Sequence, residues 1–232
     1  MRIVVITGAS QGIGATVARR LAEPETILCL VSRNRERLEA VASEVRIRGA
    51  DALVVPCDVT DPAAVEGMAR SVRQYAGVPD VVVNNAGLFV PGSVVETDPE
   101  SFRDQVDVNL TSAFLVTRAF LSDMMARESG HLFFMASVAS IRGYPGGVAY
   151  CAAKHGLLGL ARAVREETRT SGVRVTSLLP GATYTPSWEG ADIPESRFMP
   201  PEDVAEAIAA ALSMSPRTVA EEILLRPQLG DI

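Results

Sequence analysis

The regular alternation of short apolar runs with stretches of helical periodicity is the feature that most limits the folds open to this chain. Seven runs have the length of a β-strand: residues 2 to 7, 26 to 31, 51 to 57, 79 to 84, 131 to 136, 173 to 179 and 221 to 226. Apolar residues at helical spacing separate them, at about 12 to 22, 35 to 48, 61 to 76, 99 to 127 (with room for one break), 148 to 170 and 201 to 213. Strands buried on both faces read as continuous apolar runs, such as Val81-Val82-Val83. The alternation predicts an α/β fold, a parallel sheet of about seven strands with helices on both faces.

No linker, repeat or low-complexity segment divides the sequence, so we expect a single doubly wound domain over residues 1 to 232. In such folds ligands bind beyond the carboxyl ends of the strands, near the point where the strand order reverses. The residues that follow each predicted strand are therefore the candidates for a functional site.

Composition excludes several classes of partner. The net charge of -6 argues against nucleic acid, which favours basic domains. No apolar run approaches the roughly 20 residues that span a bilayer, and Arg2 to Thr7 leads directly into glycines rather than a signal peptide. We therefore expect a cytoplasmic protein without membrane contact. The three cysteines have no metal-ligand spacing, so we expect reduced thiols and no metal site.

A glycine-rich turn follows the first predicted strand, in Thr7-Gly8-Ala9-Ser10-Gln11-Gly12-Ile13-Gly14. Glycines at such a point let backbone N–H groups approach a pyrophosphate at the positive end of the next helix. The spacing is one residue looser than the usual dinucleotide fingerprint, and no Gly-Lys-Ser/Thr follows, which excludes a P-loop. A purely structural turn is the alternative; the order strand, glycines, helix favours dinucleotide binding.

The end of the second predicted strand bears on the choice of dinucleotide. Arg33 stands where dinucleotide folds place either an acid for a ribose 2′-hydroxyl or a base for a 2′-phosphate. Because no acid is present, we expect NADP(H) rather than NAD(H). The alternative is that Arg33 and Arg35 are solvated loop charges.

The only lysine of the chain, Lys154, lies four residues after Tyr150 in a predicted helix, whereas the other 21 basic residues are arginines. Residues i and i+4 share a helix face, and a phenol beside a cation ionises more easily than in water. Lysine, unlike arginine, has a pKa that its surroundings can tune. Ser137, at the end of the fifth predicted strand, is a candidate to converge with Tyr150 on one substrate oxygen. An incidental helix pair is the alternative.

Taken together, Thr7-Gly8-x-x-x-Gly12-x-Gly14, Asn84-Asn85-Ala86-Gly87, Asn109, Ser137, Tyr150-x-x-x-Lys154 and Pro180-Gly181-Ala182-Thr183-Tyr184-Thr185 resemble the short-chain dehydrogenase/reductase family in order and spacing, over nearly the whole chain. The resemblance implies a Rossmann-like fold and an NADP(H)-dependent oxidoreductase acting on a carbonyl or alcohol group. It also implies that Tyr150 is the general acid, that Ser137 hydrogen-bonds the carbonyl oxygen, that Lys154 holds the nicotinamide ribose and lowers the pKa of Tyr150, and that Asn109 maintains a water relay.

The resemblance further implies a set of cofactor contacts along the strand ends. The implied cofactor-binding residues are Gly8, Ser10, Gln11, Ile13, Gly14, Arg33, Asp58, Val59, Asn85, Gly87, Tyr150, Lys154, Thr183 and Thr185. Gln11 stands where some NADP-preferring members carry a further basic residue. The 2′-phosphate pocket would therefore depend mainly on Arg33, with help from Ser10, Asn34 or Arg35.

Residues 181 to 200, after the sixth predicted strand, should form the substrate loop. Tyr184, Trp188 and Phe198 in this stretch, with Leu88, Phe89, Ile141 and Tyr144 expected nearby, favour a hydrophobic ketone or aldehyde; an ordinary surface loop is the alternative. A β-ketoacyl-acyl-carrier-protein reductase is a second reading, although Glu128 and Ser171 stand where that group commonly carries basic residues. A third is a sensor that binds NADP without chemistry.

The two longest predicted helices suggest self-association. Family members usually pair through them, and these helices carry apolar residues beyond what one sheet face needs. We therefore expect a homodimer or homotetramer, on the basis of Phe114, Leu115, Phe120, Leu157 and Leu160.

Overall fold

A computed structural model describes residues 1–190 and 192–232. Seven strands form one sheet in the order β3-β2-β1-β4-β5-β6-β7, and every neighbouring pair is parallel. Each strand overlaps its predicted run and ends within two residues of it, so the expected α/β, Rossmann-like class is confirmed. The strands are β1 (Arg2–Thr7), β2 (Thr26–Ser32), β3 (Asp51–Pro56), β4 (Val81–Asn84), β5 (Gly130–Met135), β6 (Val173–Pro180) and β7 (Glu222–Leu225).

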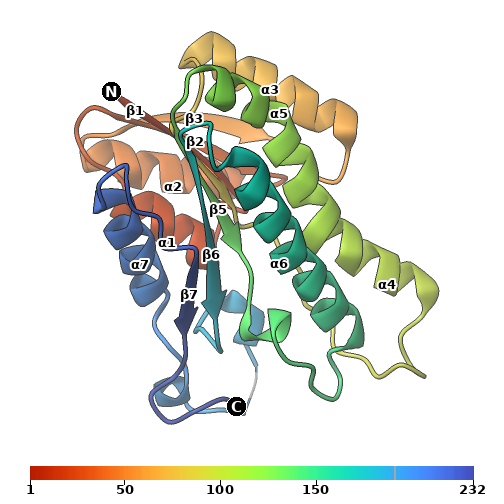
Figure 1. Cartoon of the computed structure of the whole chain (residues 1–232). Coiled ribbons are helices and arrows are strands. Elements are labelled where there is room, and N and C mark those ends of the chain that lie inside the picture. Colours follow the sequence, from red (N-terminus) through yellow and green to blue (C-terminus); the bar gives the residue numbers. More distant parts are fainter. Residues whose placement is uncertain (191) are drawn as a thin grey trace.

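Helices cover both faces of the sheet (Figure 1). The longer ones are α1 (Gly12–Arg20), α2 (Arg35–Ile47), α3 (Pro62–Tyr75), α4 (Pro99–Val106), α5 (Ser112–Ala126), α6 (Val148–Thr168) and α7 (Pro201–Ser213). Three single turns, η2 (Val138–Ser140), η3 (Pro186–Trp188) and η4 (Glu195–Arg197), lie in the connections after β5 and β6. Helices α1, α2 and α7 pack on one face of the sheet, and α3, α5 and α6 pack on the other.

The two faces are separated residue by residue along the strands. In β1, Val4 and Ile6 pack toward α1, α2 and α7, whereas Ile3 and Val5 pack toward α3, α5 and α6. Because side chains alternate along a strand, a run that is apolar at every position contributes to both cores at once. This is the physical reason that the continuous apolar runs indicated a sheet covered on both sides.

Local signals in the sequence set several helix starts. Asp61 and Asp98 each accept a hydrogen bond from the backbone N–H two residues later, and each precedes a proline in the first helical turn. An aspartate cap satisfies a free amide, and a proline there loses no helical hydrogen bond. Asn34 caps α2 in the same way by accepting from the backbone N–H of Arg37.

The segment predicted as one helix over 99 to 127 contains a widened turn. Between α4 and α5 the chain forms η1 (Asp107–Thr111), a π-helical stretch with helical dihedral angles at both ends. Within it, the Asn109 side-chain amide donates to the Gln105 carbonyl at 2.8 Å and to the Leu88 carbonyl at 2.7 Å. The expected break is therefore a π-turn, a feature that often marks functional sites.

Most of the residues that suggested self-association pack at least partly within the fold. Phe120 and Leu157 are buried within the fold, and Leu115 and Leu160 pack partly against the same core. Of the five apolar residues assigned to a surplus, only Phe114 is substantially exposed, at 47%. Fewer apolar residues are left over on these helices than the sequence suggested, because the helices also pack on one another.

Two further expectations bear on the interior and on membranes. Cys29, Cys57 and Cys151 are buried free thiols, and burial raises the pKa of Cys29 to about 12. Among the residues that the structure describes, no helix combines the length and the apolar character needed to cross a bilayer.

Candidate functional site

The glycine-rich turn after β1 is too tight for side chains. Gly8 has a φ of +67°, a conformation that favours glycine. A Cβ at Gly14 would lie 2.3 Å from the Gly8 carbonyl oxygen and 2.5 Å from Nδ2 of Asn85. The same Nδ2 donates to the Thr7 carbonyl at 2.9 Å, so Asn85 braces the turn from the end of β4. At the switch point between β1 and β4, the Gly8 backbone and the Asn85 amide therefore occupy the space that a side chain on Gly14 would need.

The first turn of α1 offers its amides to an anion. Gln11 is the N-cap, but its side chain makes no capping bond, and no acid lies in that turn. Unsatisfied N–H groups and the helix dipole make this end electropositive. Ser10, Gln11 and Ile13 all lie here and are at least partly exposed. The glycine cradle and the open helix end both fit a dinucleotide pyrophosphate.

The arginines after β2 differ in their contacts. Arg33 is exposed and forms no ion pair within the described part of the chain, and Arg35 pairs with Glu39 at 3.4 Å. Asn34 is occupied as the α2 cap. Arg37 was not singled out from the sequence, yet its guanidinium donates to the side-chain oxygen of Gln11. The sequence does contain a signal for Arg37: Asn34 is a typical capping residue, and a cap at Asn34 places Arg37 in the first turn of α2.

The third strand ends beside Arg33. The pKa of Asp58 is lowered, first by hydrogen bonds from the backbone N–H and hydroxyl of Thr60, and further by the charge of Arg33. Val59, the other predicted residue here, is 9% exposed and packs with the core on the α3 side. Arg33, Asp58 and Val59 thus gather at the same sheet edge as the glycine turn.

Gly87, just after the fourth strand, lies beside Lys154. A Cβ on Gly87 would lie 3.0 Å from Oδ1 of Asn109 and 3.6 Å from Nζ of Lys154. Asn109 also accepts from the Leu88 backbone N–H at 3.2 Å. The three predicted residues Gly87, Asn109 and Lys154 are brought into contact, although they come from a loop, the π-turn and α6.

Lys154 is fully enclosed. Its side chain is buried, and Nζ donates to the Met135 carbonyl at the end of β5, at 2.8 Å. Burial disfavours the ammonium form and lowers the pKa of Lys154 to about 7. Nζ lies 5.5 Å from the centre of the Tyr150 ring.

The expected lowering of the Tyr150 pKa is wrong for this structure. Burial raises the pKa of Tyr150, a hydrogen bond with Ser137 partly opposes the rise, and Cys151 adds to it. The sequence argument counted the lysine charge, whereas the loss of solvent around the phenolate is the larger effect. The phenol therefore keeps its proton at neutral pH.

Ser137 caps η2 just after β5. Its hydroxyl oxygen accepts from the Ala139 backbone N–H at 3.1 Å and lies 3.4 Å from the Pro180 carbonyl oxygen. Ser137 also lowers the pKa of Tyr150 somewhat, so the two side chains lie near each other. The Ser137 hydroxyl, at the end of β5, and the Tyr150 phenol, on α6, thus lie in the same part of the site.

Apolar side chains surround this place. The Phe89 ring packs edge-on against the Tyr150 ring, with centroids 5.2 Å apart. Tyr144 lies close enough for Tyr150 to contribute to the rise of the Tyr144 pKa, which burial chiefly causes. Leu88, Phe89 and Ile141 are each at least 40% exposed. Phe89 thus presents an exposed apolar ring beside the phenol.

Residues 181 to 200 form a loop with a closed base; Ala191 lies outside the described residues. Thr183 pairs with Met199 across the base, and the Thr183 hydroxyl donates to the Gly181 carbonyl at 3.0 Å. Thr185 contacts the glycine turn, 3.4 Å from a Cβ built on Gly12. Phe198 is buried against Trp188 and Tyr184, with ring centroids 4.9 and 5.7 Å away. This loop therefore has an apolar interior and touches the predicted phosphate end.

Metal chemistry has no visible ligand set here. In residues 1–190 and 192–232, no group of three or more His, Cys, Asp or Glu side chains is arranged to hold an ion.

Known proteins share this sequence pattern. The family model described as short chain dehydrogenase matches residues 2–194. A sepiapterin reductase of Chlorobaculum tepidum is 36% identical over 238 aligned residues, covering 99% of this chain and 98% of that protein.

Solved structures share the fold over the full length. An alcohol dehydrogenase from the archaeon Thermococcus sibiricus, complexed with 5-hydroxy-NADP, superimposes with a TM-score of 0.92 at 32% identity, covering 100% of this chain and 99% of that one. A variant of actinorhodin polyketide ketoreductase with NADPH has a TM-score of 0.89 at 28% identity, covering 100% and 98%.

Proposed function

The chain belongs to the short-chain dehydrogenase family, and from that premise we propose that it is an NADP(H)-dependent oxidoreductase that interconverts a carbonyl group and an alcohol, with Tyr150 as the general acid and base. The observation that carries the proposal is the meeting of Tyr150, Ser137 and Lys154 at the sheet edge that holds the glycine turn. Tyr150 and Lys154 lie one turn apart on α6, and Ser137 comes from the end of β5, 13 residues before Tyr150.

The side chains divide the work of carbonyl reduction. Bound NADPH supplies the hydride that goes to the carbonyl carbon. The hydroxyl of Tyr150 donates its proton to the carbonyl oxygen, and the Ser137 hydroxyl donates a hydrogen bond to the same oxygen as its negative charge develops. The raised pKa of Tyr150 suits this direction, because the acid must be protonated before the transfer.

After the proton transfer, Lys154 stabilises the phenolate that Tyr150 has become. In a buried site a phenolate and an ammonium stabilise each other more strongly than in water. With a pKa of about 7, Nζ gains and loses a proton near neutral pH. We assign Asn109, which meets Lys154 at Gly87, to the route that returns the proton from solvent.

The preference for NADP(H) rests on the arginines beside Gln11. Arg33 is free of an ion pair among the described residues, and Arg37 brings a second guanidinium to the position where some relatives carry a basic residue in the turn itself. Two guanidinium groups at this edge fit the doubly charged 2′-phosphate. Two similar proteins of known structure were solved with NADP-type cofactors, which supports the assignment.

A carrier-bound substrate is the second candidate, favoured by the likeness to a polyketide ketoreductase. An acidic carrier protein needs exposed basic residues. Arg169 is paired with Glu166 at 2.9 Å, and Arg174 donates to the carbonyls of Ala211 and Met214. Both arginines are already engaged, so we favour a free hydrophobic ketone or aldehyde.

The test is a substrate panel with the purified protein. Ketones, aldehydes, quinones and acyl thioesters, the thioesters both free and carrier-bound, are offered with NADPH and separately with NADH. We expect NADPH consumption with a free apolar carbonyl and at least about tenfold lower kcat/KM with NADH, the effect of one lost charge-assisted hydrogen bond.

Each other outcome has a clear meaning. Tight NADPH binding without consumption on the whole panel would favour a sensor without chemistry. Preference for carrier-bound thioesters would favour the ketoacyl reductase. Equal use of NADH would remove Arg33 and Arg37 from cofactor selection.

A further inference from the structure

The last residues of the chain fold back against the carboxyl edge of the sheet. After β7, the Gly230 N–H donates to the Pro227 carbonyl at 2.9 Å and closes a turn, with Gly230 at a φ of +83°. The turn returns Asp231 to Arg226, whose guanidinium contacts both carboxylate oxygens; Nε lies 3.2 Å from Oδ1. A two-point contact of this kind fixes orientation as well as distance.

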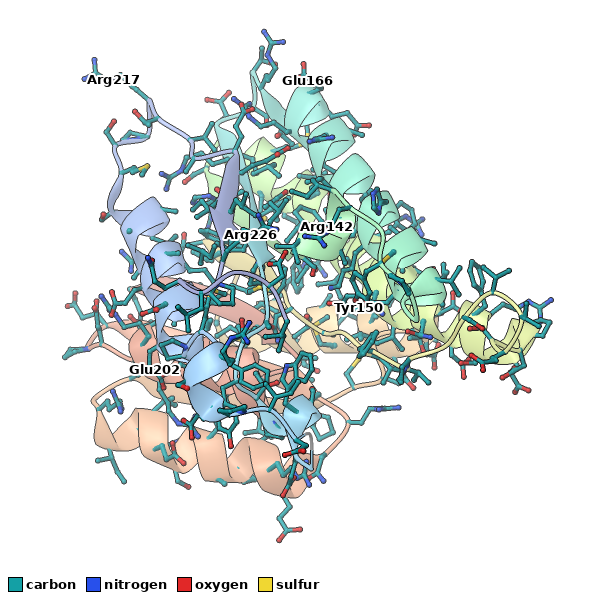
Figure 2. The ribbon with its side chains drawn as sticks, turned by 90° about the horizontal axis from the view of Figure 1, so that it is seen from below. Arg142, Tyr150, Glu166, Glu202, Arg217 and Arg226 are labelled. Carbon is teal, nitrogen blue, oxygen red and sulfur yellow. The ribbon has the colours of Figure 1, made fainter. Side chains whose placement is uncertain are left out.

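Asp231 also holds two loops that are far apart in the sequence. Arg142, between η2 and α6, donates to Oδ2 of Asp231 at 2.5 Å. Arg197, in η4 of the 181 to 200 loop, donates to the Asp231 backbone oxygen at 3.3 Å. In Figure 2, which looks onto the carboxyl edge of the sheet, Arg142 and Arg226 lie together in the central region that also contains Tyr150.

This contact differs from the other ion pairs of the described chain. The Asp231 side chain is 24% exposed, less than any other carboxylate in an ion pair among the described residues. It faces two guanidinium groups, as does only the more exposed Glu39 among the described residues. Partly buried pairs are screened less by salt and solvent than exposed ones.

We propose that Asp231 is a positioning residue that ties together the two walls of the substrate opening. The proposal rests on the proposed function, and on residues 181 to 200 being the substrate loop that the sequence predicts. The base of that loop is held by Thr183 and Met199, but η4 is held to the rest of the molecule through Arg197. Arg142 anchors the segment that leads from Ser137 to Tyr150.

Asp231 acts on binding rather than on proton transfer. Phe198 follows Arg197 directly and packs against Trp188, so losing the tail contact lets this apolar wall shift. Lys154 stays in place without the tail, because Met135 of β5 holds it. A residue that supports binding of the ground state and the transition state equally changes KM and leaves kcat in place.

The first experiment compares Asp231→Asn with Asp231→Glu in the full chain. For Asp231→Asn we expect KM for the carbonyl substrate to rise about tenfold, the effect of one charge-assisted hydrogen bond, with kcat and the NADPH dissociation constant within about twofold. Asp231→Glu should recover part of the loss. The matched control is Glu222→Gln, which removes the ion pair with Arg162 and should change none of these constants. An unchanged KM in Asp231→Asn, or an equal rise in the control, overturns the proposal.

The second experiment does not depend on activity. Trypsin cleaves after arginine, so release of the tail should speed cleavage after Arg142 and Arg197 in Asp231→Asn, relative to cleavage after the exposed Arg217, as followed by mass spectrometry. Unchanged relative rates would overturn the clamp and leave the proposed function standing. If the wild type reduces no carbonyl, the proposed function fails, and the proteolysis alone decides on the clamp.

Discussion

At the scale of the residue, burial sets the chemistry of Tyr150 and Lys154. It raises the pKa of the phenol and lowers the pKa of the amine to about 7, so each group is pushed toward its neutral form. Near neutral pH the phenol therefore stays protonated, whereas Lys154 can gain or lose a proton. The motif names the two residues, but the low-dielectric surroundings give them this behaviour.

We predict that Tyr150→Phe lowers the turnover number by at least about a hundredfold, the low end for removing a positioned acid. Phenylalanine keeps the ring that packs against Phe89, so the fold and the apolar surface remain. Turnover is measured by NADPH oxidation at saturating substrate, with NADPH binding and thermal unfolding as controls. Turnover near the wild-type value would remove Tyr150 from the acid role.

At the scale of the element, the glycine turn and helix α1 are built for close backbone approach. Gly14 lies inside the first turn of α1, where helix propensity alone favours alanine over glycine by about 1 kcal/mol. The Gly8 carbonyl stands where a Cβ would go. Local propensity and tertiary packing therefore oppose each other at this position.

We predict that packing prevails in Gly14→Ala, destabilising the protein by about 1 to 3 kcal/mol and weakening NADPH binding. The control is Gly159→Ala in α6, where a Cβ meets nothing within 4 Å; there we expect about 0.5 to 1 kcal/mol of stabilisation. Denaturant unfolding and cofactor titration measure both effects. Equal stabilisation by the two changes would show that the turn has room for a side chain.

At the scale of the whole molecule, the start of β5 holds a buried histidine away from the proposed site. His131 is 1% exposed, and its Nε2 lies 2.7 Å from the Thr176 hydroxyl. Its Nδ1 has no hydrogen-bond partner among the residues described. Burial, and next the charge of Arg174, lowers the pKa of His131 to about 3. The folded protein therefore keeps this ring neutral.

This histidine makes global stability depend on pH. The unfolded chain binds a proton at His131 below about pH 6.5, whereas the folded chain binds it only near pH 3. Because the unfolded state holds more protons in that window, the free energy of unfolding falls as pH falls, by up to about 1.4 kcal/mol per unit. We predict a shallower fall between pH 6.5 and 4.5 for His131→Gln than for the wild type, in urea unfolding series. Parallel curves would contradict the assignment.

The sequence by itself determined the fold class, the seven strands and the edge at which the chemical residues gather. These follow from local causes: the period of apolar residues, glycines at a strand end, and capping residues such as Asp61 and Asp98. Residues at strand ends of a parallel sheet must share an edge, so Gly8, Asn85 and Ser137 could be assigned to one region without coordinates.

Only the tertiary structure decided how those residues behave. The direction of the Tyr150 pKa depends on how much solvent the fold removes, which no spacing encodes. The contacts of Arg37 with Gln11 and of Asp231 with Arg142 join segments 26 and 89 residues apart. Long-range contacts and local dielectric are properties of the packed molecule, because they depend on every element that surrounds a group and not on its neighbours in the chain.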